Sequence, residues 1–182
     1  EVTMRQMVLY LFDKYNPCLW PYYLYILNYK QMMDRILNIV SYRAEHGAYI
    51  MKQQMNHTLM DKDMEFDGNP NNLEQDNLAF TGMIDGKPIF AAGMKIIWKG
   101  VAEGWVLATK DVLDHPLLVA KAIRKDFARI AKENNINRVQ SAVRANYTTG
   151  LKFAKWLGLE EEGLMKKFGF DGSDQYMYAR IF

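Results

Sequence analysis

The sequence predicts a mixed α/β fold, in which a mostly antiparallel central sheet carries helices on both faces. Three observations lead to this prediction. Strand-like runs separated by turn residues fill positions 78–109, and an amphipathic helix pattern covers positions 116–134. After residue 137, strand and helix patterns alternate before a final hairpin. Antiparallel strands followed by a β-α-β-α-β order imply a mixed sheet with helices on both faces.

Residues 1–33 differ in composition from the rest of the chain. They are rich in Tyr, Leu and Met and are interrupted by two prolines. We expect two short helical pieces here, at 5–15 and 22–33, whose aromatic side chains need a neighbour to cover them. This segment is therefore expected to be an N-terminal extension that packs on the domain formed by residues 34–182. The alternative is a contact with a second copy of the chain.

The predicted elements of the domain follow one another from residue 36 onward. They are a strand at 36–42, a helix at 45–55, a second short helix at 61–66, strands at 78–84, 88–98 and 103–109, a helix at 116–134, a strand at 137–143, a helix at 147–157, and strands at 159–168 and 175–181. Asp85-Gly86 and Lys99-Gly100 are the turn signals between the middle strands. Asp114 is the expected N-cap of the long helix, and Gly93 indicates a β-bulge inside its strand.

Composition and charge exclude several classes of function. Hydrophobic residues make up 49% and charged residues 24% of the 182, which is typical of a soluble globular protein. Twenty-three basic and 21 acidic residues leave a formal charge of +2, which argues against binding nucleic acid or a membrane through bulk charge. The single Cys18 cannot form an internal disulfide, and three separated histidines do not make a zinc site. The most apolar stretch, residues 17–29, is too short to span a bilayer.

Several segments resemble the GNAT superfamily of N-acyltransferases. The segment 138–163, RVQSAVRANYTTGLKFAKWLGLEEEG, looks like the family's fifth strand, fourth helix and sixth strand. Residues 39–46 resemble its opening strand and helix start, and residues 103–109 occupy the fourth-strand position. The likeness covers about residues 35–182 and extends to GNAT-like proteins of tailed bacteriophages, including the internal virion protein group of T7-type podophages. It implies a location in the cytoplasm of a bacterial host or in the virion.

The resemblance implies a binding site for acetyl-CoA between the fourth and fifth strands. In the family these strands separate at one end, and the backbone of the fourth strand pairs with the pantetheine arm. The positions that match in this chain are Leu107, Ala108 and Thr109. The pyrophosphate is expected at the loop 110–116, because unpaired N–H groups at a helix start favour an anion.

This loop departs from the family pattern. It contains no glycine, two carboxylates, and Pro116, which removes one N–H donor. Lys110 and His115 are the side chains that compensate in part, by direct contact with phosphate. The sequence therefore predicts a weakened pyrophosphate site.

Acid–base chemistry is a separate question. Direct acyl transfer to an amine needs a base for the ammonium proton and benefits from a donor to the departing thiolate. The family implies Glu103 as the base, and the alternative is a solvated carboxylate at a strand end. The family's thiolate donor is a helix Tyr, and its position holds Ala154 in this chain. Tyr147 is the substitute, unless it serves only in packing.

Other conspicuous side chains have a binding and a structural interpretation. Phe153 is expected beside the cofactor. Asn146 either bonds the pantetheine or caps the helix that follows it. Trp98, Trp105 and Trp156 are expected in the core or in the wall of the cleft. The long helix also carries a row of basic residues, which favours a solvated face over a nucleic-acid contact: Lys121, Arg124, Lys125, Arg129 and Lys132.

Two functions remain open from the sequence. The first is an acetyl-CoA-dependent N-acetyltransferase, whose partners are an acyl-CoA and a primary amine. The second is a catalytically inactive GNAT-like phage protein, either a virion component or a module that interacts with the host, with residues 1–33 as the contact. A nucleic-acid-binding role is a distant third because the chain is close to neutral.

Overall fold

The computed structural model describes residues 37–53 and 69–182. The helical pieces predicted at 5–15, 22–33 and 61–66 lie outside the described residues, as do the last residues of the helix predicted at 45–55. The predicted N-terminal extension, residues 1–33, lies outside them as well.

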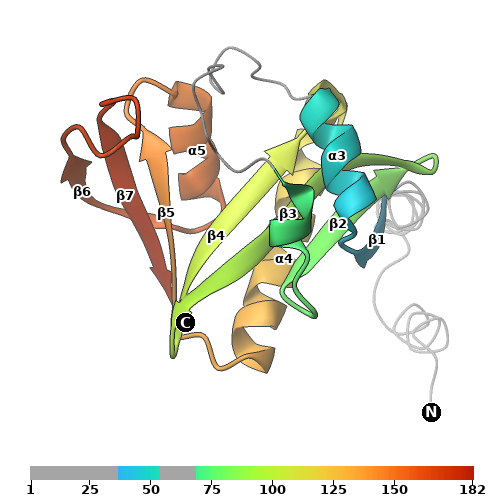
Figure 1. Cartoon of the computed structure of the whole chain (residues 1–182), viewed down its shortest axis with the longest axis horizontal. Helices are drawn as coiled ribbons and strands as arrows, with labels where there is room; N and C mark the ends of the chain where they lie inside the picture. The colour runs from blue at the N-terminus through green and yellow to red at the C-terminus, as the bar shows by residue number, and fades with distance from the viewer. Residues whose placement is uncertain (1–36, 54–68) are drawn as a thin grey trace, which may run out of the picture. The chain divides into compact units, whose positions relative to one another are not determined.

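A seven-stranded sheet forms the centre of the described domain (Figure 1), with the strand order β1-β2-β3-β4-β5-β7-β6. Its strands are β1 (Leu37–Ser41), β2 (Ala79–Ile84), β3 (Lys87–Trp98), β4 (Val101–Ala108), β5 (Arg138–Arg144), β6 (Glu160–Met165) and β7 (Gln175–Ile181). Only β4 and β5 pair in parallel, and all other neighbours are antiparallel. The predicted mixed and mostly antiparallel sheet is confirmed.

Helices cover both faces of the sheet, as predicted. They are α3 (Ala44–Lys52), α4 (Pro116–Glu133) and α5 (Thr148–Trp156), together with two 3-10 helices, η2 (Pro70–Leu73) and η3 (Lys110–Asp114). α3 packs its Ile50 against Ala91 and Leu107 of the middle strands, in a small cluster of its own. The larger core joins α4 and α5 to the other face, where alternate residues of the same strands point.

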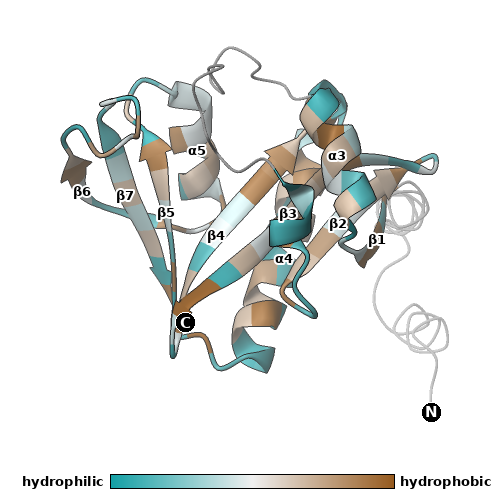
Figure 2. Ribbon diagram, viewed as in Figure 1, coloured by the Kyte–Doolittle hydropathy of each residue, from teal (hydrophilic) through white to brown (hydrophobic). Residues whose placement is uncertain are grey.

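α4 provides much of this larger core. Ile123, Phe127 and Ile130 are at most 5% exposed, and they recur at helical spacing. Phe127 meets Phe80 of β2 edge to face, with ring centroids 6.3 Å apart. Burying each of these side chains stabilises the fold by about 1.5–3 kcal/mol. Figure 2 shows the resulting alternation of hydrophobic and hydrophilic residues along α4.

Turns and bulges follow local sequence in some places only. Asp85 and Gly86 have φ angles of 49° and 74°, the pair of positive values that a two-residue type I′ hairpin requires. The bulge predicted at Gly93 is wrong, because β3 keeps its register with β2 and β4 there. Gly93 is instead a close-approach position, where an added β carbon would lie 2.6 Å from Cζ2 of Trp105.

Three further expectations are corrected. Asp114 is not the N-cap of α4, because η3 continues through Asp114 and His115 takes the N-cap position. Trp98 and Trp156 are exposed rather than in the core, at 60% and 48%. Trp98 is the last residue of the long strand β3. The two residues before it, Ile96 and Ile97, are also exposed, and the end of β3 is hydrophobic in Figure 2. Of the three tryptophans in the described residues, Trp105 is the one that packs inward, edge to face on the Tyr42 ring.

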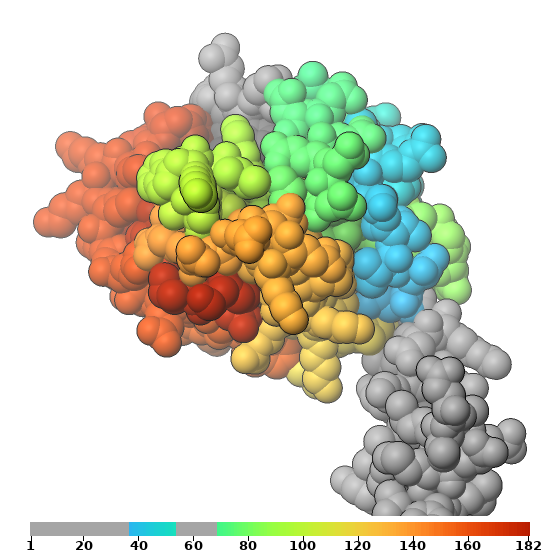
Figure 3. All heavy atoms as spheres, turned by 90° about the horizontal axis from the view of Figure 1, so that it is seen from below, coloured from blue at the N-terminus to red at the C-terminus, as the bar shows by residue number. Residues whose placement is uncertain are grey.

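The C-terminus is fixed against the segment between α4 and β5. The backbone N–H of Phe182 donates to the carbonyl of Asn137 at 2.9 Å. Figure 3 shows the C-terminal residues, in dark red, lying among orange residues of this segment. Within residues 37–53 and 69–182, no helix is long and apolar enough to cross a membrane. The same residues contain no group of three or more metal-ligating side chains.

Candidate functional site

The two parallel strands of the sheet separate after three residue pairs. β4 and β5 pair at Val101 with Arg138, at Ala102 with Val139 and at Glu103 with Gln140. β4 then continues for five residues and β5 for four, with no further pair between them. The edges that face each other beyond Glu103 and Gln140 therefore border a gap in the sheet.

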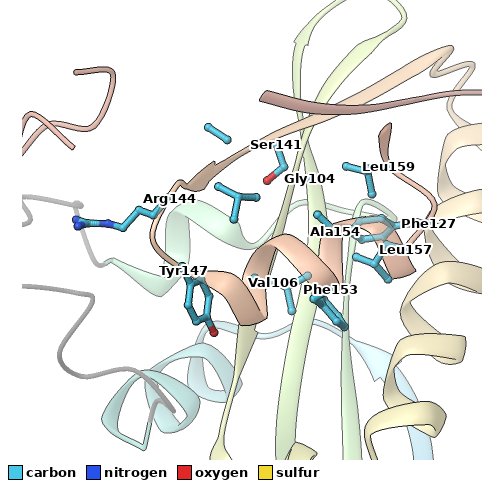
Figure 4. A pocket seen from close by; sticks show the side chains of 13 residues that line it. Gly104, Val106, Phe127, Ser141, Arg144, Tyr147, Phe153, Ala154, Leu157 and Leu159 are labelled. Atoms are coloured by element: carbon cyan, nitrogen blue, oxygen red, sulfur yellow. The ribbon is translucent and has the colours of Figure 1, made fainter. Parts of the chain in front are cut away.

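A cleft of about 290 Å³ occupies the α4–α5 side of this gap (Figure 4). β4, β5, α4 and α5 all contribute to its wall, which is mostly apolar. Its apolar side chains include those of Val106, Val143, Phe127, Phe153, Leu157 and Leu159. A narrow apolar cleft between two strand edges suits an extended chain that has few charges.

Gly104 makes room for the cleft at its closed end. A β carbon added there would lie 3.0 Å from Cγ1 of Val139 and 3.3 Å from Cε2 of Phe127. Gly104 has ordinary strand geometry, so the missing side chain matters here through space and not through backbone freedom.

Three polar side chains line the cleft, those of Ser141, Arg144 and Tyr147. Nη1 of Arg144 lies 2.8 Å from Oδ2 of Asp171, in the β6–β7 loop. Hydrogen bonding from Ser173 and the Arg144 guanidinium together hold the pKa of Asp171 below its usual range. Nη2 of Arg144 is buried and has no hydrogen-bond partner among residues 37–53 and 69–182. Arg144 therefore fixes the β6–β7 loop to the end of β5.

Glu103 occupies the last paired position before the strands separate. Side chains alternate along a strand, so Glu103 points to the sheet face opposite the one that bears the cleft. Its side chain is exposed, and it does not line the cleft. Glu103 thus lies at the gap between the strands but on the α3 side of the sheet.

The residues predicted around the start of α5 are placed differently from one another. Tyr147 and Phe153 both line the cleft, and the Tyr147 ring packs over Gly150. Asn146 is exposed and does not line it. Asn146 is also not the helix cap, because Tyr147 holds the N-cap position and no side chain bonds the first turn.

The three predicted β4 positions do not place their side chains in the cleft. Leu107 is buried against α3, and Ala108 packs on the larger core. Thr109 is 1% exposed, and its hydroxyl accepts from the Asp111 N–H at 3.3 Å. These residues border the gap through their backbone alone. One edge of β4 pairs with β3, and the other edge is left without a strand partner once β5 has separated.

The loop predicted to hold a pyrophosphate is mostly a 3-10 helix, η3. Backbone N–H groups of this segment already donate hydrogen bonds within the protein. The N–H of Val112 donates to the Thr109 carbonyl, and that of His115 donates to the Val112 carbonyl. Lys110 is exposed at the start of η3. The fit of this segment to a pyrophosphate is poor, whereas the apolar cleft fits a pantetheine arm.

Sequence reasoning missed Gly104, Ser141 and Arg144 as cleft residues. Gly104 and Arg144 each lie within two residues of a predicted site residue, and Ser141 lies inside the strand predicted at 137–143. The missing information was the register of β4 against β5, which fixes where the gap opens.

No protein-family model and no curated protein matches this sequence. Solved structures do match. A GNAT-family acetyltransferase from Bacillus anthracis is 16% identical, covering 81% of this chain and 95% of its own, with a TM-score of 0.61. Ard1 from Thermoplasma volcanium is 14% identical, covering 80% and 97%, with a TM-score of 0.67. The microcin C7 self-immunity acetyltransferase MccE, solved with acetyl-CoA and AMP, is 14% identical, covering 82% and 94%, with a TM-score of 0.62. The described domain therefore has the fold of the GNAT acyltransferases.

Proposed function

We propose that the protein is an N-acetyltransferase that transfers the acetyl group of acetyl-CoA to a primary amine by direct attack. The observation that carries the proposal is the apolar cleft that opens where β4 and β5 separate. MccE, which has a similar fold, was solved with acetyl-CoA bound. Proximity of the two reactants supplies much of the rate in such transfers.

In this proposal most of the residues bind acetyl-CoA, and one acts as the base. The backbone of Leu107, Ala108 and Thr109 and the side chain of Phe153 hold the pantetheine arm, with Tyr147 at the mouth of the cleft. Lys110 and His115 lie on the segment that adjoins the pyrophosphate. Glu103 takes a proton from the acceptor's ammonium group, directly or through water, from the opposite sheet face, and the neutral amine then attacks the thioester.

The proposal is tested by a thermal-shift titration with acetyl-CoA, using ATP and dephospho-CoA as comparison ligands. A ligand that binds only the folded state adds about 2.7 kcal/mol at 100 times its dissociation constant, a shift that is easily measured. We expect acetyl-CoA to raise the melting temperature and ATP to leave it unchanged. No shift at millimolar acetyl-CoA would contradict the proposal.

The second candidate is a GNAT fold without catalysis, and η3 is the observation that favours it. Backbone N–H groups of this segment donate within the protein, and two of its own residues, Asp111 and Asp114, are exposed carboxylates. On this alternative the chain is a phage protein, in the virion or in contact with a host protein, as the sequence resemblance implies. Absence of acetyl-CoA binding together with an intact fold would favour it, and a pull-down from the bacterial host would follow.

A further inference from the structure

The side chain of Ser141 lines the apolar cleft. Figure 4 shows this side chain among those that line the cleft. Among the described residues, this hydroxyl makes no hydrogen bond. Of the other two polar side chains of the cleft, Tyr147 interacts within the protein, and Arg144 is held by Asp171 through Nη1 only.

The position of Ser141 follows from the strand register. Gln140 forms the last pair with β4, so Ser141 is the first β5 residue beyond the point of separation. Val139, two residues earlier, is buried in the core, and alternation places Ser141 on the same face. The hydroxyl therefore lies near the closed end of the cleft.

Packing alone does not call for a hydroxyl at this position. The neighbouring cleft residues Ala142 and Val143 are apolar, and the hydroxyl of the half-buried Ser141 is open to the space of the cleft. A ligand atom that accepts a hydrogen bond can therefore reach it. Tyr147 lies at the start of α5, and its hydroxyl points away from Ser141 in Figure 4. Ala154 of α5, which also lines the cleft, has no hydrogen-bond donor in its side chain.

The chemistry of acetyl transfer creates an acceptor in this region. The amine nitrogen forms a bond to the thioester carbonyl carbon, the C–S bond breaks, and its electron pair stays on sulfur. The amine proton passes to a base, for which Glu103 is placed on the opposite face. A developing thiolate between Val106, Phe153 and Leu157 has little solvent, so an oriented donor stabilises it strongly.

We propose that Ser141 is a catalytic residue whose hydroxyl donates a hydrogen bond to the thioester sulfur as the CoA thiolate departs. The serine keeps its proton, because an alcohol is a much weaker acid than a thiol, and the thiolate is protonated from solvent after release. The proposal rests on the acetyltransferase function. It places the base and the hydrogen-bond donor on opposite faces of the sheet at one gap. Glu103, the base, is on the α3 side, and Ser141, the donor to the thiolate, is on the α4–α5 side.

The test compares Ser141→Ala with a matched control, Ser41→Ala, an exposed serine of β1. Release of the CoA thiol from acetyl-CoA is measured with spermidine, lysine and an alanine-led peptide, and the fastest acceptor is kept for all variants. We expect Ser141→Ala to lower kcat about 10²-fold, the scale for losing one donor to developing charge. Its melting temperature and its acetyl-CoA shift should match those of the wild type.

A substrate with a better leaving group distinguishes a catalytic role of Ser141 from a structural one. An acetyl thioester of 4-nitrothiophenol releases a far more acidic thiol, which needs little stabilisation. The Ser141→Ala defect should then shrink to a few-fold, whereas a distorted cleft would slow both substrates equally. Equal defects, or no defect with acetyl-CoA, would overturn the assignment of Ser141. A wild type that neither binds acetyl-CoA nor releases thiol would overturn the acetyltransferase function and this proposal with it.

Discussion

Gly104 of β4 lies so close to Val139 of β5 that a β carbon at position 104 would be 3.0 Å from the valine Cγ1. Gly104 is the first β4 residue beyond the last pair with β5, and it lines the cleft. The absent side chain is therefore what keeps the closed end of the cleft open.

Gly104→Ala should narrow the cleft at its closed end. The added methyl must displace Val139 or Phe127 by a few tenths of an ångström, at a cost in unfolding free energy of about 1 kcal/mol. We expect the acetyl-CoA dissociation constant to rise at least tenfold, because the methyl takes the space of the acetyl end. Thermal-shift titration of the variant with acetyl-CoA measures this dissociation constant, with Ser41→Ala as the control. Unchanged affinity would mean that the ligand does not reach Gly104.

Local sequence was sufficient where one element carries its own signal. The bounds of β7 were predicted at 175–181 as found, and those of α4 to within one residue. Both depend on short-range patterns: alternation in a strand, and spacings of three and four in a helix. The mixed sheet followed from the order of such elements.

The cleft depends on relations between distant segments, which a single sequence does not encode locally. That Glu103 faces Gln140, and that pairing stops there, is set by the packing of β4, β5 and α5 together. Exposure of Trp98 was missed for a related reason, because β3 outruns β2 and leaves its end uncovered. Gly93 was assigned to a bulge, whereas its partner is the ring of Trp105 on the next strand.

Glu103→Gln should separate catalysis from binding. Glu103 lies on the sheet face opposite the cleft, so its loss should leave acetyl-CoA affinity nearly unchanged. Removing a general base lowers turnover by roughly 10²-fold or more at neutral pH. Steady-state kinetics and the thermal-shift titration measure the two effects, with Glu160→Gln on the exposed edge strand β6 as the control. An unchanged rate would remove Glu103 from the mechanism.

Tyr42 should make the fold sensitive to alkaline pH. Burial, together with the nearby Glu74 carboxylate, raises the pKa of Tyr42 to about 12, from 10.0. A raised pKa in the folded state stabilises the fold below the unfolded pKa, and this contribution is lost as pH rises through the folded value. The free energy of unfolding of the wild type should therefore fall by about 1–3 kcal/mol between pH 10 and 12 relative to Tyr42→Phe.

Urea unfolding at a series of pH values measures this difference. At pH 8 the variant should already be less stable by about 1 kcal/mol, because the Tyr42 hydroxyl donates to the Pro70 carbonyl at 3.0 Å. Subtracting the variant curve removes the titration of all other tyrosines and lysines. A difference that stays constant from pH 8 to 12 would show that Tyr42 ionises alike in the folded and unfolded chains.

The negative charges of Asp111 and Asp114 should weaken the binding of acetyl-CoA, because they repel its phosphates. Both carboxylates are exposed on η3, the segment next to the expected pyrophosphate, and η3 offers few free amides in return. The double variant Asp111→Asn, Asp114→Asn should bind acetyl-CoA about 3- to 10-fold more tightly at low salt, and the gain should shrink above 0.5 M salt because the ions screen exposed charges. The control pair Asp76→Asn, Asp85→Asn removes the same charge from exposed positions outside η3. Equal affinity of both pairs would mean that net charge acts alone, whereas a gain confined to the η3 pair places the phosphates beside Asp111 and Asp114.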